Sequence, residues 1–132
     1  MTIEEAPASR GRLAAELSTA MVRMHSDHYG RGPTKARTYL FDDLAICVMQ
    51  DVYTTVERTL IRTGREAQVR EMRQAFQDAM EDEFRTAVEV ITGRKVRAFL
   101  SQIEIEPEVS VELFLFEPDP EQRGEPPVAD GD

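Results

Sequence analysis

The sequence predicts an α+β protein with the element order α-β-β-α-α-β-β, arranged as a two-layer sandwich. A long stretch from residue 65 to residue 92 repeats apolar residues at helical spacing. One pair of strand-like runs precedes this stretch and another follows it, and only a few turn residues separate the members of each pair. Since closely spaced strands form hairpins, we expect an antiparallel four-stranded sheet covered by the long helix and a first helix.

The first helix is predicted over residues 11–29, where apolar side chains share one stripe. Gly30 supplies the helix stop, and Pro33 prevents the helix from continuing. The stripe contains Leu13, Leu17, Ala20, Met21, Met24 and His28.

Two strands are predicted next, over residues 37–42 and 44–50. Two adjacent aspartates, Asp42 and Asp43, give the only turn signal between them. The second run, LAICVM, is apolar on both of its faces. This pattern predicts a central strand that is covered on both sides.

A short helix is predicted between Thr54 and Gly64, with Thr54 as its N-cap and Glu57 completing a capping box. The long helix follows, and Gly93 closes it. Its stripe contains Val69, Met72, Phe76, Ala79, Met80, Phe84, Ala87, Val88 and Ile91. The last two strands are KVRAFLSQIEIEP and VSVELFLFEP, with a turn near Pro107 and Glu108.

The length of the long helix predicts a homodimer. A helix of this length exceeds the span of the predicted strands, so part of its apolar stripe is expected to extend beyond its own sheet. A second copy would cover that part. In the alternative, the first helix and the C-terminal strands cover the whole stripe.

Composition and charge describe one small domain with an acidic tail. The 132 residues carry a net charge of −9, with 41% hydrophobic and 31% charged residues. Residues 1–10 are expected to be flexible, residues 11–117 to fold, and residues 118–132 to be disordered, because six acids, four prolines and two glycines fill residues 117–132. Such acidity argues against nucleic-acid binding.

Several features favour a cytoplasmic protein. No apolar run approaches the roughly 20 residues that cross a bilayer. The acidic N-terminal residues do not form a secretory signal. The single cysteine, Cys47, excludes an internal disulfide and fits a reducing compartment.

The loop GRGPTKAR, residues 30–37, concentrates cations on a backbone shaped by Gly30, Gly32 and Pro33. It does not match a P-loop, because its glycines are one residue apart and a strand follows it. The loop also follows a helix C-terminus, so it lacks the free amides of a helix N-terminus.

Two interpretations of these cations stay open on the residues alone. In one, the side chains of Arg31, Lys35 and Arg37 hold an anion. In the other, Arg31 and Lys35 compensate the carboxyl end of the first helix.

Other residue clusters do not indicate catalysis. His25 and His28 resemble half of a metal site but have no further ligands, so packing and capping are predicted for them. A turn is predicted at Asp42 and Asp43, because adjacent strand residues point to opposite faces. No nucleophile–base pair is visible, and we expect neither an enzyme nor a bound cofactor or metal.

Three segments resemble the MpsC family of small bacterial proteins with YbcI-like domains: YGRGPTKAR at residues 29–37, the strand TYLFDD, and Thr92-Gly-Arg94. The resemblance covers roughly residues 11–117. The family name implies association with a sodium-translocating, membrane-potential-generating system whose membrane partners resemble inorganic-carbon transporters. No catalytic residues come with it.

The resemblance gives the loop cations a function. It implies that Arg31, Thr34, Lys35 and Arg37 bind a ligand or partner. One hypothesis is a non-catalytic accessory or regulatory protein, dimeric and peripheral to the inner face of the membrane, that docks on a membrane transporter through residues 30–37. The alternative is a cytosolic sensor of a small anion such as a nucleotide, phosphate or bicarbonate.

Overall fold

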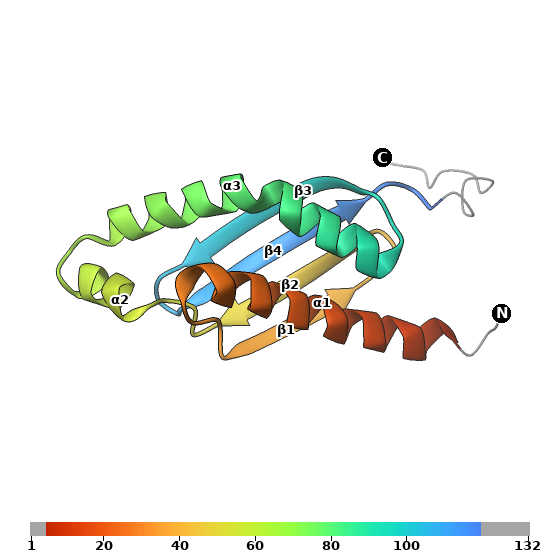
Figure 1. Cartoon of the computed structure of the whole chain (residues 1–132), viewed down its shortest axis with the longest axis horizontal. Coiled ribbons are helices and arrows are strands. Elements are labelled where there is room, and N and C mark those ends of the chain that lie inside the picture. The colour runs from red at the N-terminus through yellow and green to blue at the C-terminus, as the bar shows by residue number, and fades with distance from the viewer. Residues whose placement is uncertain (1–4, 120–132) are drawn as a thin grey trace.

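The computed structural model describes residues 5–119 and confirms the predicted class and element order (Figure 1). The sheet is antiparallel throughout, with the strand order β1-β2-β4-β3. The predictions for residues 1–4 and 120–132 lie outside the described residues. The elements are α1 (Glu5–Tyr29), β1 (Lys35–Leu40), β2 (Leu44–Gln50), α2 (Thr55–Arg62), α3 (Glu66–Thr92), β3 (Val96–Glu104) and β4 (Val109–Phe116).

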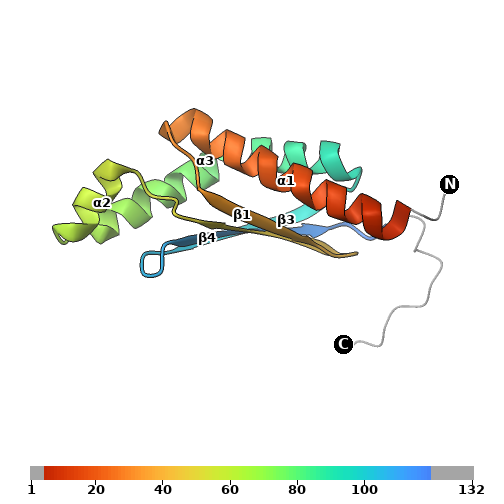
Figure 2. The same cartoon turned by 90° about the horizontal axis from the view of Figure 1, so that it is seen from below.

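The helices α1 and α3 lie side by side on one face of the sheet (Figure 2). Side chains alternate along each strand, so every second residue points into the layer between helices and sheet. The core between the layers is formed by Leu17, Met21, Ala45, Cys47, Met49, Val52, Tyr53, Val69, Met80, Phe84, Val88, Val96, Ile105, Phe114 and Phe116.

The prediction that β2 is covered on both faces is wrong for one face. Ala45, Cys47 and Met49 point toward the helices and are buried, whereas the alternate residues are only half-buried. No helix or strand among residues 5–119 covers that second face (Figure 2). An apolar run therefore marked a central strand correctly but did not show how many layers cover it.

Two element boundaries differ from the prediction. α1 begins at Glu5, so residues 5–10 are helical where a flexible segment was expected. Gly11 lies inside the helix, where glycine lowers stability by about 1 kcal/mol without ending a helix. β1 covers Lys35–Leu40, because Phe41 already belongs to the turn and donates from its N–H to the carbonyl of Leu44 at 2.8 Å.

The buried stripe of α3 is rotated from the predicted one. Arg73 and Gln77 are buried with the apolar residues, whereas Met72 and Ala79 are exposed. Val69, near the start of the helix, is already fully buried. Its own chain thus covers the start of the helix at Val69, whereas Met72 is 44% exposed. The homodimer that was predicted from this stripe stays a prediction.

Candidate functional site

The loop after α1 has a backbone that glycine makes possible. Gly30 adopts a φ of 82° and donates from its N–H to the carbonyl of Ser26 at 2.9 Å, which ends the helix. A Cβ at Gly32 would lie 2.2 Å from the Ser26 hydroxyl and 3.1 Å from the Val22 carbonyl oxygen. Pro33 is buried. The chain thus folds tightly against the end of α1 before it enters β1.

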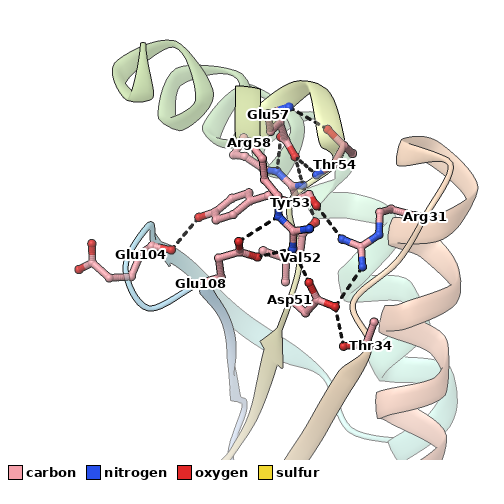
Figure 3. A network of polar contacts seen from close by, with 11 residues as sticks. Arg31, Thr34, Asp51, Val52, Tyr53, Thr54, Glu57, Arg58, Glu104 and Glu108 are labelled. Carbon is pink, nitrogen blue, oxygen red and sulfur yellow. Dashed lines mark hydrogen bonds and ion pairs between the residues drawn. The ribbon is translucent and has the colours of Figure 1, made fainter. Parts of the chain in front are cut away.

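Asp51, which follows β2, joins this loop to the rest of the domain (Figure 3). Its Oδ2 atom accepts from the Thr34 hydroxyl at 2.8 Å and from Nη2 of Arg31 at 3.1 Å. Its Oδ1 atom accepts from Arg58. The hydrogen bonds from Thr34, Arg58 and Arg31 lower the pKa of Asp51. Asp51 has a φ of 58°, the left-handed region that aspartate tolerates better than most residues.

Arg58 of α2 extends this polar network to the turn between β3 and β4 (Figure 3). It donates to both carboxylate oxygens of Glu108, from Nε at 3.0 Å and from Nη2 at 2.9 Å. Paired first with Glu108 and then with Asp51, Arg58 has a raised pKa. Two acids and two arginines therefore hold one end of the domain together, a network that the sequence analysis missed.

The structure does not bring the three loop cations to one point. Arg31 is turned inward, where it donates to Asp51 and, at 2.6 Å, to the carbonyl of Tyr53. Lys35 and Arg37 are exposed at alternate positions of β1. The guanidinium of Arg37 lies 4.9 Å from the ring centre of Tyr39. Arg31 thus fixes the loop, whereas Lys35 and Arg37 face outward.

Lys35 and Thr34 line a shallow open pocket of about 410 Å³ at this end of the sheet. Lys35 and Arg58 bring positive charge to it, and Asp51 and Glu108 bring negative charge. The pocket is therefore polar with nearly balanced charge.

A buried ion pair supports this end of the domain from inside. Arg73 donates to Glu57 from Nε at 2.7 Å and from Nη2 at 2.6 Å, and both side chains are about 2% exposed. Glu57 also completes the capping box with Thr54, which confirms that prediction. The Arg73 guanidinium donates to the carbonyl of Val52 and lies 3.8 Å from the ring centre of Tyr29.

A second buried polar group lies in the middle of the core. Nδ1 of His25 is 2.7 Å from the carbonyl oxygen of Met21, which can only accept, so Nδ1 carries the proton. Nε2 then faces Nε2 of Gln77 at 3.5 Å and Oε2 of Glu112 at 3.8 Å. Burial lowers the pKa of His25 and raises the pKa of Glu112 to about 8. At pH 7 both side chains are therefore neutral.

The sequence carried a weak signal for these missed residues. Glu112 shares its strand phase with Phe114 and Phe116, and Arg73 lies one helical turn from Val69. A charged residue in phase with apolar ones is a candidate for a buried, paired charge. Across the described residues, no three His, Cys, Asp or Glu side chains are grouped as a metal site would require.

The fold and this polar network define the class of protein as a small domain. One layer of helices packs on a four-stranded antiparallel sheet, and the basic loop of residues 30–37, hydrogen-bonded to Asp51, lies at one end. The chain belongs to the MpsC family, because the family model described as Na+-translocating membrane potential-generating system (MpsC) matches residues 9–118.

One curated relative is the uncharacterized protein YrhF of Bacillus subtilis (strain 168), which is 23% identical over 104 residues, 77% of this chain and 85% of the relative. No solved structure was found to match the chain. None of the helices within residues 5–119 has the length and apolar character needed to cross a membrane.

Proposed function

We propose that this protein is a non-catalytic, dimeric accessory or regulatory protein of a membrane system that translocates sodium ions or inorganic carbon. It acts in the cytoplasm or at the inner face of the membrane and docks on its membrane partner through the loop of residues 30–37. The family description supports the link to a sodium-dependent membrane potential.

The docking proposal rests on one observation, which is that the loop cations take two different positions. Arg31 and Thr34 are held by Asp51, which fixes the backbone of the loop. Lys35 and Arg37 extend from the adjoining edge strand into solvent. A fixed backbone with two outward cations is suited to an acidic segment of a partner, because little conformational entropy is lost on binding.

The small-anion alternative has less support. Arg31 is occupied by Asp51 and by the carbonyl of Tyr53. The pocket beside Lys35 contains two carboxylates, which repel an anion. A sensor would need the cations to converge on one point, and these cations diverge.

The test compares cells that lack the gene with cells that produce the wild type or Lys35→Ala/Arg37→Ala. Membrane potential is followed with a potential-sensitive dye at low and high external sodium. The wild type is expected to restore a sodium-dependent potential, and the double variant is expected to lose most of that effect.

Arg12→Ala/Arg23→Ala is the matched control, because both arginines are exposed on α1 and lie outside residues 30–37. It is expected to behave as the wild type does. The oligomeric state of each variant is measured first on purified protein. Equal potentials with and without the protein at every sodium concentration would exclude the proposal. Saturable thermal stabilisation by phosphate or bicarbonate, lost in Lys35→Ala/Arg37→Ala, would instead favour the sensor.

A further inference from the structure

The face of the sheet that points away from the helices is mostly apolar. We call this surface the open face. Leu100 of β3 is 56% exposed on it, and Tyr39 of β1 is 41% exposed. Between these edges lie the half-buried apolar residues of the two central strands. The open face consists of Lys35, Arg37, Tyr39, Leu44, Ile46, Val48, Gln50, Ala98, Leu100, Gln102, Glu104, Val109, Val111, Leu113 and Leu115.

The strand register arranges these residues in rows across the sheet. One row reads Tyr39, Ile46, Leu113 and Leu100, and the next toward the turn after β1 contains Leu44, Leu115 and Ala98. In the other direction, the rows read Arg37, Val48, Val111 and Gln102, then Lys35, Gln50, Val109 and Glu104. Polarity therefore increases steadily from one end of the open face to the other.

The open face is large enough for a specific interface. With about 4.8 Å between strands and about 3.4 Å per residue, four strands of roughly seven residues present about 450 Å² of flat surface. Side-chain relief increases this area, so two copies would bury about 1,000 Å² or more in total, where specific interfaces begin. An apolar patch of several hundred Å² is at the upper end of what monomers expose, and such patches are often binding surfaces.

We infer that a second copy of this chain covers the open face, so that two sheets pack face to face as a sandwich. The inference rests on the proposed function in that the accessory protein is dimeric, and the two share Lys35 and Arg37. Both cations lie on the edge strand β1, so in this dimer they are at the rim of the interface. The packing follows from a two-fold axis that runs between the sheets, parallel to the strands. Such an axis places every row over the same row of the partner copy, with β1 over β3 and β2 over β4.

This axis matches both polarity and charge. The apolar rows pack on apolar rows, with Tyr39 over Leu100 of the second copy. In the polar row, Lys35 at one edge lies over Glu104 at the other edge. The side chain of Glu104 is 55% exposed at the edge of the sheet, where its Oε1 atom also accepts from Arg70 of α3 at 3.0 Å, so Lys35 would join an existing ion pair. A two-fold axis across the strands would instead place Leu44 over Gln50, which pairs apolar side chains with polar ones.

Sedimentation and light scattering of the purified full chain, across a wide range of concentration, test this inference without any membrane partner. The wild type is expected at twice the 15.0 kDa of one chain. Leu100→Glu is expected to weaken the dimer roughly a hundredfold or more, because it places an unpaired carboxylate against apolar side chains. The variant is expected to keep its helix and strand content by circular dichroism, since Leu100 lies outside the core.

Val90→Glu is the matched control, because Val90 is 76% exposed on the helical layer. It is expected to remain dimeric. A monomeric wild type would overturn the inference. A Leu100→Glu variant that dimerises as well as the wild type does would also overturn it, since the contact would then lie elsewhere. Because the measurement uses the purified protein alone, its failure is distinguishable from failure of the membrane assay.

Discussion

The two faces of the sheet differ in where their polar groups lie. The face under the helices carries ionisable and polar groups, including Glu112 and Thr38, each beside a polar partner from a helix. The open face carries almost only apolar side chains along its two central strands. A two-layer domain normally places polar residues on its open face. The comparison indicates that buried polar pairs within the chain help to specify the covered face, whereas the apolar centre of the open face is suited to contact with another surface.

On the covered side of the sheet, the Arg73–Glu57 pair joins α3 to α2 inside the domain. Arg73→Ala would leave the Glu57 carboxylate buried without its main partner, and this is expected to lower the free energy of unfolding by about 3–5 kcal/mol. Urea denaturation followed by circular dichroism measures the change. Arg70→Ala is the control, because Arg70 pairs with Glu104 and Glu66 at the surface and such pairs contribute about 0–1 kcal/mol. Equal decreases in the free energy of unfolding of the two variants would show that the buried pair stabilises the protein no more than the surface pair does.

Glu112, on the covered face, is expected to make the stability of the folded protein depend on pH. Its pKa is raised from 4.5 to about 8 by burial, so the folded chain keeps a proton that the unfolded chain releases. Stability is therefore full below pH 4.5 and is lost as the pH rises toward 8. The lowered pKa of His25 acts in the opposite sense at acidic pH, so the test uses pH 7 to 9.

Glu112→Gln should remove this pH dependence, because an amide does not titrate. The wild type is expected to lose on the order of 1 kcal/mol of stability per pH unit as the pH approaches 8, and the variant is expected to stay nearly constant. Thermal or urea unfolding at each pH gives the comparison. Parallel pH profiles would mean that Glu112 is ionised in the folded protein.

Substitutions at Asp51, which lies at the end of the sheet beside the loop of residues 30–37, are expected to change stability less. Asp51→Ala and Asp51→Gly both remove the acceptor for Arg31, Thr34 and Arg58. Only alanine also strains the backbone at a φ of 58°. Alanine is therefore expected to be less stable than glycine by about 1 kcal/mol, measured by urea denaturation. Identical midpoints for the two variants would show that the backbone at residue 51 relaxes freely.

The element order was predictable because helical and strand periodicities are local signals, and the capping box at Thr54 and Glu57 was predictable for the same reason. The partners of Arg31 and Arg73 were not, since Asp51 and Glu57 approach them only after the sheet and helices assemble. The strand LAICVM shows why the number of layers around the sheet could not be predicted. Its two apolar faces predict burial of both, but they do not say whether this chain or another one covers the second face.

The most direct test of the account is a cross-link that reads the arrangement of two open faces. Tyr39→Cys and Leu100→Cys chains are mixed and treated briefly with a bismaleimide about 10 Å long, the usual distance between packed sheets. The native Cys47 is buried, with its pKa raised to about 11, so it reacts slowly. The account predicts a cross-linked dimer from the mixture and little from either variant alone. Efficient cross-linking of Tyr39→Cys with itself, or no cross-link in the mixture, would contradict it.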